Sequence, residues 1–231
     1  MDWTKYTKKP TDPAVTAKVR DHLLSLREIV CLGDRTDYLV AQAFNKTVLD
    51  VGVCGGAEAL ISDSTWLHRR VIKVASEVLG VDVLEHDIEL LRREGFNVRC
   101  VDATSDVDIG KKFELVLFGD VIEHVENPVA LLRFGNRHLS KHGQVLVSSP
   151  NPHYYRFRRA LSRGNPLVPN LEHVSWITPA YAMELGRRAG LSLVRYTCFI
   201  NRTRLFKRRV ICRPPSEEYT SDYVYHFERA S

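Results

Sequence analysis

Short apolar runs alternate with longer amphipathic stretches through the middle of the chain, and this alternation predicts the order of its elements. The runs are rich in β-branched residues, which is typical of strands buried on both faces of a parallel sheet. We expect strands over 47–51, 78–83, 97–101, 113–118 and 144–148. Helical spacing of apolar residues predicts helices over 13–29, 35–44, 58–79, 87–94, 127–139 and 178–189, with an irregular insertion at 63–70. The alternation predicts right-handed βαβ units and an α/β, doubly wound, mostly parallel sheet.

The C-terminal part predicts an antiparallel hairpin. Strands are expected over 191–200 and 205–212, joined by a polar turn at 201–204, and they would complete a seven-stranded sheet. The Tyr-rich, polar residues 214–231 are expected to pack loosely or to serve a partner. We expect one domain over 1–231, divided into N-terminal helices (1–45), a core (46–149), a lid or substrate segment (150–177), and a C-terminal helix, hairpin and tail (178–231).

Composition narrows the class of protein. The 231 residues are 44% hydrophobic and 26% charged, as in ordinary globular proteins. No apolar run approaches the ~20 residues that cross a bilayer, and the polar start lacks the apolar region of a signal peptide. Five scattered cysteines without a Cys-x-x-Cys pair indicate reduced thiols and argue against structural zinc. These features predict a cytoplasmic protein.

The net charge of +5 is distributed unevenly. Residues 151–213 contain 13 Lys and Arg but only two acids. Within the proline-rich segment 150–172, the run 153–159 mixes aromatic and basic residues, and the segment is longer than an average connection. This basic lid could bind a phosphate or pyrophosphate on the substrate, contact an anionic membrane at its periphery, or stack on RNA. A solvated basic helix face is the alternative.

A glycine turn and three acids indicate a ligand site. The strand 47–51 runs into Gly52, Gly55 and Gly56, and glycine lets a ligand approach the backbone closely. Asp50, Asp82 and Asp102 follow successive strands, whose carboxyl ends line one crevice in an open parallel sheet. Asp82 is placed to accept both ribose hydroxyls, and Asp102 an exocyclic amine such as that of adenine. The alternative is that both acids cap helices.

Two other nucleotide sites are disfavoured. A dinucleotide fingerprint would need Gly at position 54 and an acid ~20 residues after the first glycine, whereas Asp82 comes later. No Gly-Lys-Ser/Thr run is present, so a phosphate-binding P-loop is excluded.

At these residues the chain resembles the class I S-adenosylmethionine-dependent methyltransferases of the small-molecule branch. The resemblance covers about residues 47–190 and rests on four motifs in order: Val-Leu-Asp-Val-Gly-x-x-x-Gly from 48, Gly-Val-Asp-Val from 80, Asp-Ala at 102–103, and Asp-Val-Ile-Glu-His-Val-Glu-Asn-Pro from 120. It implies a Rossmann-like fold and S-adenosyl-L-methionine as cofactor. The cofactor-binding residues that it implies are Asp50, Gly52, Val53, Gly56, Asp82, Val83, Asp102, Ala103, Gly119 and Asp120. Cys54 departs from the family pattern, which usually has Gly there, so we expect a slightly altered loop.

The family reaction displaces the sulfonium methyl in line, so the protein mainly aligns the reactants. For a hydroxyl acceptor, a histidine is the natural base. His124, just past the fourth strand, is the first catalytic candidate, although it could instead shape the loop. His173 follows the lid and is the second candidate. Glu123 could orient His124 or cap the next helix. His68 could cover the cofactor, but a surface role is expected.

No His or Asp cluster has the spacing of metal ligands, so no metal site and no metal-dependent catechol-type mechanism are predicted. Trp66-Leu67-His68 together with Glu172-His173-Val174-Ser175-Trp176 resembles members that modify sugars and polysaccharides. We therefore expect O-methylation of a small-molecule, saccharide or glycolipid hydroxyl, in polysaccharide biosynthesis. A nucleic-acid methyltransferase is the second hypothesis, disfavoured because the Asn/Asp-Pro-Pro-Tyr/Phe motif is absent. A non-catalytic scaffold is the third, and the retained acids argue against it.

Overall fold

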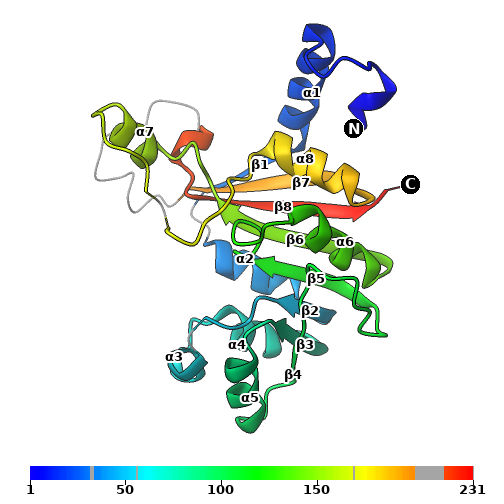
Figure 1. Ribbon diagram of the computed structural model, residues 1–231, viewed down its shortest axis with the longest axis vertical. Helices are drawn as coiled ribbons and strands as arrows, with labels where there is room; N and C mark the ends of the chain where they lie inside the picture. The colour runs from blue at the N-terminus through cyan, green and yellow to red at the C-terminus, as the bar shows by residue number, and fades with distance from the viewer. Residues whose placement is uncertain (32–33, 56, 169, 201–215, 231) are drawn as a thin grey trace.

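The computed structural model describes residues 1–31, 34–55, 57–168, 170–200 and 216–230. The strands within these residues are β1 Arg27–Cys31, β2 Thr47–Val51, β3 Glu77–Asp82, β4 Val98–Cys100, β5 Phe113–Gly119, β6 Leu139–Pro150, β7 Leu191–Ile200 and β8 Asp222–Arg229. They form one eight-stranded sheet in the order β1-β7-β8-β6-β5-β2-β3-β4 (Figure 1). Neighbouring strands are parallel except where β8 pairs with β6 and β7. The predicted α/β fold with an antiparallel C-terminal pair is confirmed.

The helices are α1 Pro13–Leu26, α2 Arg35–Gln42, α3 Ala57–Ser62, α4 Leu67–Ile72, α5 Glu85–Arg93, α6 Pro128–Arg137, α7 Tyr155–Leu161 and α8 Pro179–Arg188. Three of them start as the sequence predicts, because Asp12, Asn127 and Thr178 accept hydrogen bonds from the first-turn amides of α1, α6 and α8. None of the helices in the described part of the chain combines the length and apolar character that a bilayer-spanning segment needs.

Helices cover both faces of the sheet (Figure 1). The helices α1, α6 and α8 pack with Leu49 and Phe118 in one apolar cluster, whereas α2 and α4 pack with Val48 and Leu117 in another. Successive strand residues therefore enter opposite cores, as expected for strands buried on both sides. The short helix α7 projects beyond the edge at which the parallel strands end (Figure 1).

The first difference from the sequence prediction is β1. Helix α1 ends at Leu26, and residues 27–31 pair in parallel with 196–200 of β7. Ile29 packs against the first core cluster and Val30 against the second, which is strand periodicity. The expected helix over 13–29 is too long because its apolar spacing continues by chance into this edge strand. The described residues contain eight strands against the seven expected, because β1 and β8 were not predicted and the expected strand 205–212 lies outside the described part.

The second difference lies in the tail. Residues 222–229 form β8 in the middle of the sheet, so the expectation that they pack loosely is wrong. Tyr223, Tyr225 and Phe227 are fully buried, because both neighbouring strands and helices cover them. The partner predicted for β7, residues 205–212, lies outside the described residues, and β8 takes the antiparallel position beside β7.

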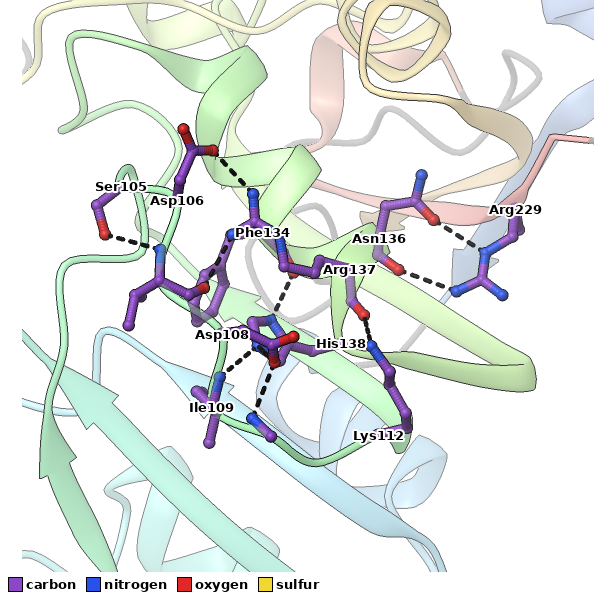
Figure 2. Close-up of polar contacts among 12 residues, drawn as sticks. Ser105, Asp106, Asp108, Ile109, Lys112, Phe134, Asn136, Arg137, His138 and Arg229 are labelled. Carbon is purple, nitrogen blue, oxygen red and sulfur yellow. Dashed lines mark hydrogen bonds and ion pairs between the residues drawn. The ribbon is translucent and has the colours of Figure 1, made fainter.

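A buried histidine holds the loop between β4 and β5 in place (Figure 2). The His138 Nδ1–H donates to the Phe134 carbonyl at 2.8 Å, and Nε2 accepts the Ile109 amide at 3.0 Å. Burial lowers the pKa of His138, so the neutral ring is favoured. Arg137 also binds Asp106 at 2.9 Å. These contacts from the end of α6 fix the loop that begins with Asp102.

Candidate active site

A cavity of about 600 Å³ opens at the carboxyl ends of β2, β3, β4 and β5. The strand order reverses between β2 and β5, and such switch points are where open α/β sheets bind ligands. Seven of the residues expected from the sequence line this cavity: Gly52, Asp82, Val83, Asp102, Ala103, Asp120 and His124. The predicted glycine turn and the acids of β3 and β4 therefore meet in one cleft.

The glycine turn is tightly constrained. Gly52 has φ of +80°, and a Cβ there would lie 2.2 Å from Val121 Cγ2. Only glycine satisfies both the backbone conformation and the close approach. Burial, followed by the nearby Asp82 charge, raises the pKa of the Cys54 thiol, so this residue stays a neutral thiol in the turn.

Asp82 links the turn to β3. Its Oδ2 accepts the Cys54 amide at 2.8 Å, and its Oδ1 accepts the Leu84 amide at 3.1 Å. Each carboxylate oxygen can accept a second hydrogen bond, so Asp82 can position the loop and still bind a ligand hydroxyl.

Asp102 is held by its own turn. Its Oδ1 accepts the Thr104 hydroxyl at 2.7 Å and the Thr104 amide at 2.8 Å. The hydroxyl, followed by the amide, lowers the pKa of this carboxyl, which is ionised at neutral pH. The hydrogen bonds to Asp102 side-chain oxygens within the described residues use only Oδ1, which leaves Oδ2 for a ligand donor.

Three other expected cofactor residues line a smaller adjoining cavity. Asp50, Val53 and Gly119 border about 190 Å³ on the other side of the glycine turn. The Asp50 carboxylate is 3% exposed and binds His68 Nδ1 at 2.8 Å, so its partner is protein. A cofactor role for these three residues stays a prediction. Gly56 lies outside the described residues.

The insertion at 63–70 packs against the glycine turn and the end of β2. His68 is 1% exposed, so the expected surface role is wrong. Its ring occupies the space over Gly80, where a Cβ would lie 2.7 Å from His68 Cε1. Trp66 Nε1 donates to the Val53 carbonyl at 3.1 Å. The Trp-Leu-His motif therefore reaches the site through the backbone of the turn and through Asp50.

On the opposite side of the large cavity, Asp120 belongs to a charged network. Asp120 has φ of +56°, which an acid tolerates better than most residues do. Arg35 Nη1 of α2 donates to Asp120 at 2.7 Å and to Asp222 of β8 at 3.2 Å. The Ser148 hydroxyl donates to Asp120 Oδ1 at 2.9 Å. Arg35 and Asp222 were not foreseen, because nothing in the sequence connects α2 or the tail with this turn.

The two histidines expected to be catalytic lie together with Glu123. The rings of His124 and His173 meet edge to face with centroids 4.7 Å apart. Glu123 is 1% exposed, and among the described residues neither of its carboxylate oxygens has a hydrogen-bond partner. Burial, followed by the charge of Asp120, raises the pKa of Glu123 to about 8. Burial, followed by His124, lowers the pKa of His173.

Only His124 of these three residues lines the large cavity, with Glu172 beside it. His173 lies behind His124, and its Nδ1 is buried without a hydrogen-bond partner. The Val174 amide donates to the Glu123 carbonyl at 2.9 Å and ties this segment to the turn after β5. A general-base role for either histidine remains a prediction.

The sequence matches a known family. A family model described as a methyltransferase domain matches residues 26–196. The ubiquinone biosynthesis O-methyltransferase of Hydrogenovibrio crunogenus is 26% identical over 161 residues, which cover 64% of this chain and 63% of that protein. The protein of the same name from Ruegeria sp. is 26% identical over 185 residues, covering 75% and 71%. The chain thus spans less than two thirds of the length of the first of these relatives.

Solved structures share the fold. A SAM-dependent methyltransferase from Archaeoglobus fulgidus superposes with a TM-score of 0.55 at 21% identity, covering 84% of this chain and 94% of that chain. Magnesium protoporphyrin IX methyltransferase from Synechocystis with bound SAH gives 0.55 at 14% identity, covering 99% and 93%.

These matches agree with the four motifs and with the position of the cavity, and the family expected from the sequence is confirmed. The chain belongs to the methyltransferase domain family and has the fold of the S-adenosylmethionine-dependent methyltransferases.

Proposed function

We propose that this protein transfers the methyl group of S-adenosylmethionine to a hydroxyl of a small molecule. The observation that carries the proposal is that Asp82 and Asp102 line the same cavity as His124. The two carboxylates suit the ribose and adenine of the cofactor. The His124 imidazole, in this proposal, meets the methyl acceptor.

Two parts of the cavity have separate tasks in this proposal. The cofactor end consists of Gly52, Asp82 and Asp102. The acceptor end consists of Asp120 and His124, which line the cavity, and of Arg35, Glu123 and His173, which contact them from outside it. Asp120, expected from the sequence at the cofactor, belongs to the acceptor end in this proposal. The cofactor end binds the nucleoside and directs the sulfonium methyl, and the acceptor end binds the hydroxyl.

The chemical step is a single displacement. The acceptor oxygen forms a bond to the methyl carbon while the carbon–sulfur bond breaks, and the thioether product keeps the electron pair. The hydroxyl proton passes to His124 and then to solvent. Since the leaving group is neutral, alignment of oxygen, carbon and sulfur is the main contribution of the protein. An imidazole is able to accept such a proton at neutral pH.

The class of acceptor follows from two sources. The relatives named as ubiquinone biosynthesis O-methyltransferases favour a hydroxyl on a small molecule. The sequence resemblance to sugar-modifying members favours a saccharide or glycolipid hydroxyl. A panel that contains phenolic and saccharide acceptors separates the two.

We also propose that residues 150–177 form the acceptor lid. Glu172 of this segment lines the cavity, and His173 and Val174 contact the turn after β5. Arg159 and Arg163 of the lid are exposed, as is Leu161. A phosphate on the acceptor or an anionic membrane would suit this basic and apolar surface.

Calorimetry and a methyl-transfer assay test the function. We expect S-adenosylmethionine and its demethylated product to bind, and Asp82→Ala to weaken binding by more than about tenfold because two charged hydrogen bonds are lost. Asp21→Ala, which changes an exposed acid of α1, is the matched control. A protein that does not bind the cofactor, or an Asp82→Ala variant with unchanged affinity, would contradict the proposal.

A further inference from the structure

The carboxylate of Glu123 requires a partner that the described residues do not supply. Its side chain is 1% exposed, and both oxygens lack a hydrogen-bond partner. A buried polar group without a partner is costly, and a buried charge is far more so. The residue lies in the turn between β5 and α6, at the edge of the sheet where the cavity opens.

Two imidazoles face this carboxylate. One donor atom each from Glu123, His124 and His173 lies within 4.8 Å of the others. The Nδ1 atom of His173 is also buried without a partner. Among the described residues, two of the three side chains, Glu123 and His173, therefore have buried atoms without a hydrogen-bond partner, and His124 lies next to both.

The main chain holds the three side chains together. Glu123 and His124 are adjacent in the turn after β5, whereas His173 comes from the lid. The amides of Val174 and Ser175 approach the Glu123 carbonyl at 2.9 and 3.3 Å. These hydrogen bonds fix the lid segment against the turn, so the convergence does not depend on side-chain rotamers alone.

The surrounding charges favour a cation. Arg35 is the basic group beside Glu123, and its guanidinium is shared between Asp120 and Asp222. Three carboxyl groups thus surround one base. A divalent ion bound to Glu123 would displace the carboxyl proton and give the unpartnered ligand atoms of Glu123 and His173 a common partner.

We propose that Glu123, His124 and His173 bind one divalent transition-metal ion of the Zn²⁺ class. Two imidazoles and a carboxylate suit zinc and its first-row neighbours better than magnesium or calcium, which prefer oxygen ligands. Ligand atoms at ~2.1 Å from one ion are at most ~4.2 Å apart, so a small rotation of the side chains closes the site.

The ion would act on the methyl acceptor, and this part rests on the proposed function. His124 lines the cofactor cavity, so an ion bound to it has access to that cavity. A hydroxyl bound to a divalent ion loses its proton more readily, because the ion stabilises the oxyanion. With the ion bound, this route replaces the proton transfer to His124 given above: the acceptor proton leaves directly to solvent, and His124 serves as a ligand.

Cobalt binding tests the site without any reference to activity. The full chain is treated with a chelator, dialysed and titrated with Co²⁺ alone, with visible absorption and calorimetry as readouts. We expect one ion per chain, displaced by Zn²⁺. Glu123→Gln and His173→Asn should each weaken binding by more than about tenfold. His142→Asn changes an exposed histidine at the other end of β6 and should bind as the parent does.

Circular dichroism and cooperative thermal unfolding show that the parent and each variant are folded, whether or not they bind the cofactor. Absence of Co²⁺ binding in a folded parent, or unchanged binding in both Glu123→Gln and His173→Asn, would overturn the metal site whatever the methyl-transfer result. If the folded protein bound Co²⁺ but not S-adenosylmethionine, the result would support the metal site and contradict the proposed function. Methyl transfer that survives complete removal of the ion would overturn its role at the acceptor.

Discussion

The two ends of the cavity are built in different ways. At the proposed cofactor end, the carboxylates of Asp82 and Asp102 accept hydrogen bonds from nearby protein groups. The donors lie two residues further along the chain or in the adjacent glycine turn. At the proposed acceptor end, Arg35 and His173 come from segments far apart in the chain, and Glu123 has no hydrogen-bond partner among the described residues. The proposed cofactor end is held by protein hydrogen bonds before any ligand arrives, whereas in our proposal a bound ligand completes the acceptor end.

The largest expected effect tests the preorganised end. Gly52→Ala should lower the affinity for S-adenosylmethionine by at least about 100-fold, which is roughly 3 kcal/mol. The new Cβ would meet Val121 at 2.2 Å in a backbone with φ of +80°. Calorimetry measures the loss. Gly110→Ala is the matched control, since Gly110 has φ of +77° with nothing within 4 Å of the added Cβ. If both variants lost the same amount of affinity for S-adenosylmethionine, the contact with Val121 would not be the cause, and strain at a positive φ would explain the loss.

The next prediction concerns the buried contact between His68 and Asp50, which lies beside the glycine turn of the cofactor end. His68→Ala should lower the free energy of unfolding by about 2 kcal/mol, because Asp50 is left buried without its partner. Denaturant unfolding measures the change. Adding Asp50→Asn should recover part of it, since a buried amide without this partner costs less than a buried carboxyl does. A double variant no more stable than His68→Ala would show that the lost Asp50–His68 contact is not the reason.

Arg35→Met tests whether the two ends act separately. It should lower kcat for methyl transfer about tenfold, because Asp120 and Asp222 lose their shared guanidinium and the turn after β5 shifts. The Kd for S-adenosylmethionine should stay within about twofold of the parent. Arg20→Met, at an exposed position of α1, is the control. If Kd and kcat change equally, the division into two ends is wrong.

The smallest effect concerns the sheet that supports both ends. Burial, followed by Arg195, lowers the pKa of His226 to about 3, below its ordinary value near 6.5. The unfolded chain therefore binds a proton that the folded chain does not, and stability falls as the pH drops from 6.5 toward 3. One pH unit below 6.5, the loss from this residue is about 1 kcal/mol.

Thermal or denaturant unfolding as a function of pH measures the slope. His226→Gln should reduce the slope, whereas His142→Gln, at an exposed position, should leave it unchanged. Both ends should lose ligand binding together as the sheet unfolds. If only one end lost ligand binding at low pH, the two ends would not depend on the same folded sheet.

The sequence predicted the cofactor end because its determinants are local. A strand, a glycine turn and an acid after each following strand are adjacent in the chain, and the topology of parallel sheets brings them together. The starts of α1, α6 and α8 were predicted for the same reason, since a capping side chain and its amides lie within three residues.

The acceptor end and two strands could not be predicted in this way. Helical spacing continues through residues 27–30, and only pairing with β7 makes this segment a strand. The run from Tyr223 to Phe227 is rich in aromatic and β-branched residues, which is typical of a strand. The prediction of a loose tail overlooked this signal because the residues around the run are polar. Arg35 and His68 gave no comparable signal, because their importance depends on which buried acid they meet. The donor set around Glu123 joins residues ~50 positions apart, so motif spacing could not detect it.

The position of β8 bears on how the molecule is made. β1 and β7 connect to the rest of the sheet only through β8, which follows both in the chain. On the ribosome, β1 emerges roughly 10–40 s before β8 at ordinary rates of synthesis. Once β6 and β7 have emerged, and until β8 joins them, each presents an unpaired edge, and such edges attract other chains and chaperones. A nascent chain halted before residue 222 would hold two separate sheets with open edges, not a smaller version of the finished protein.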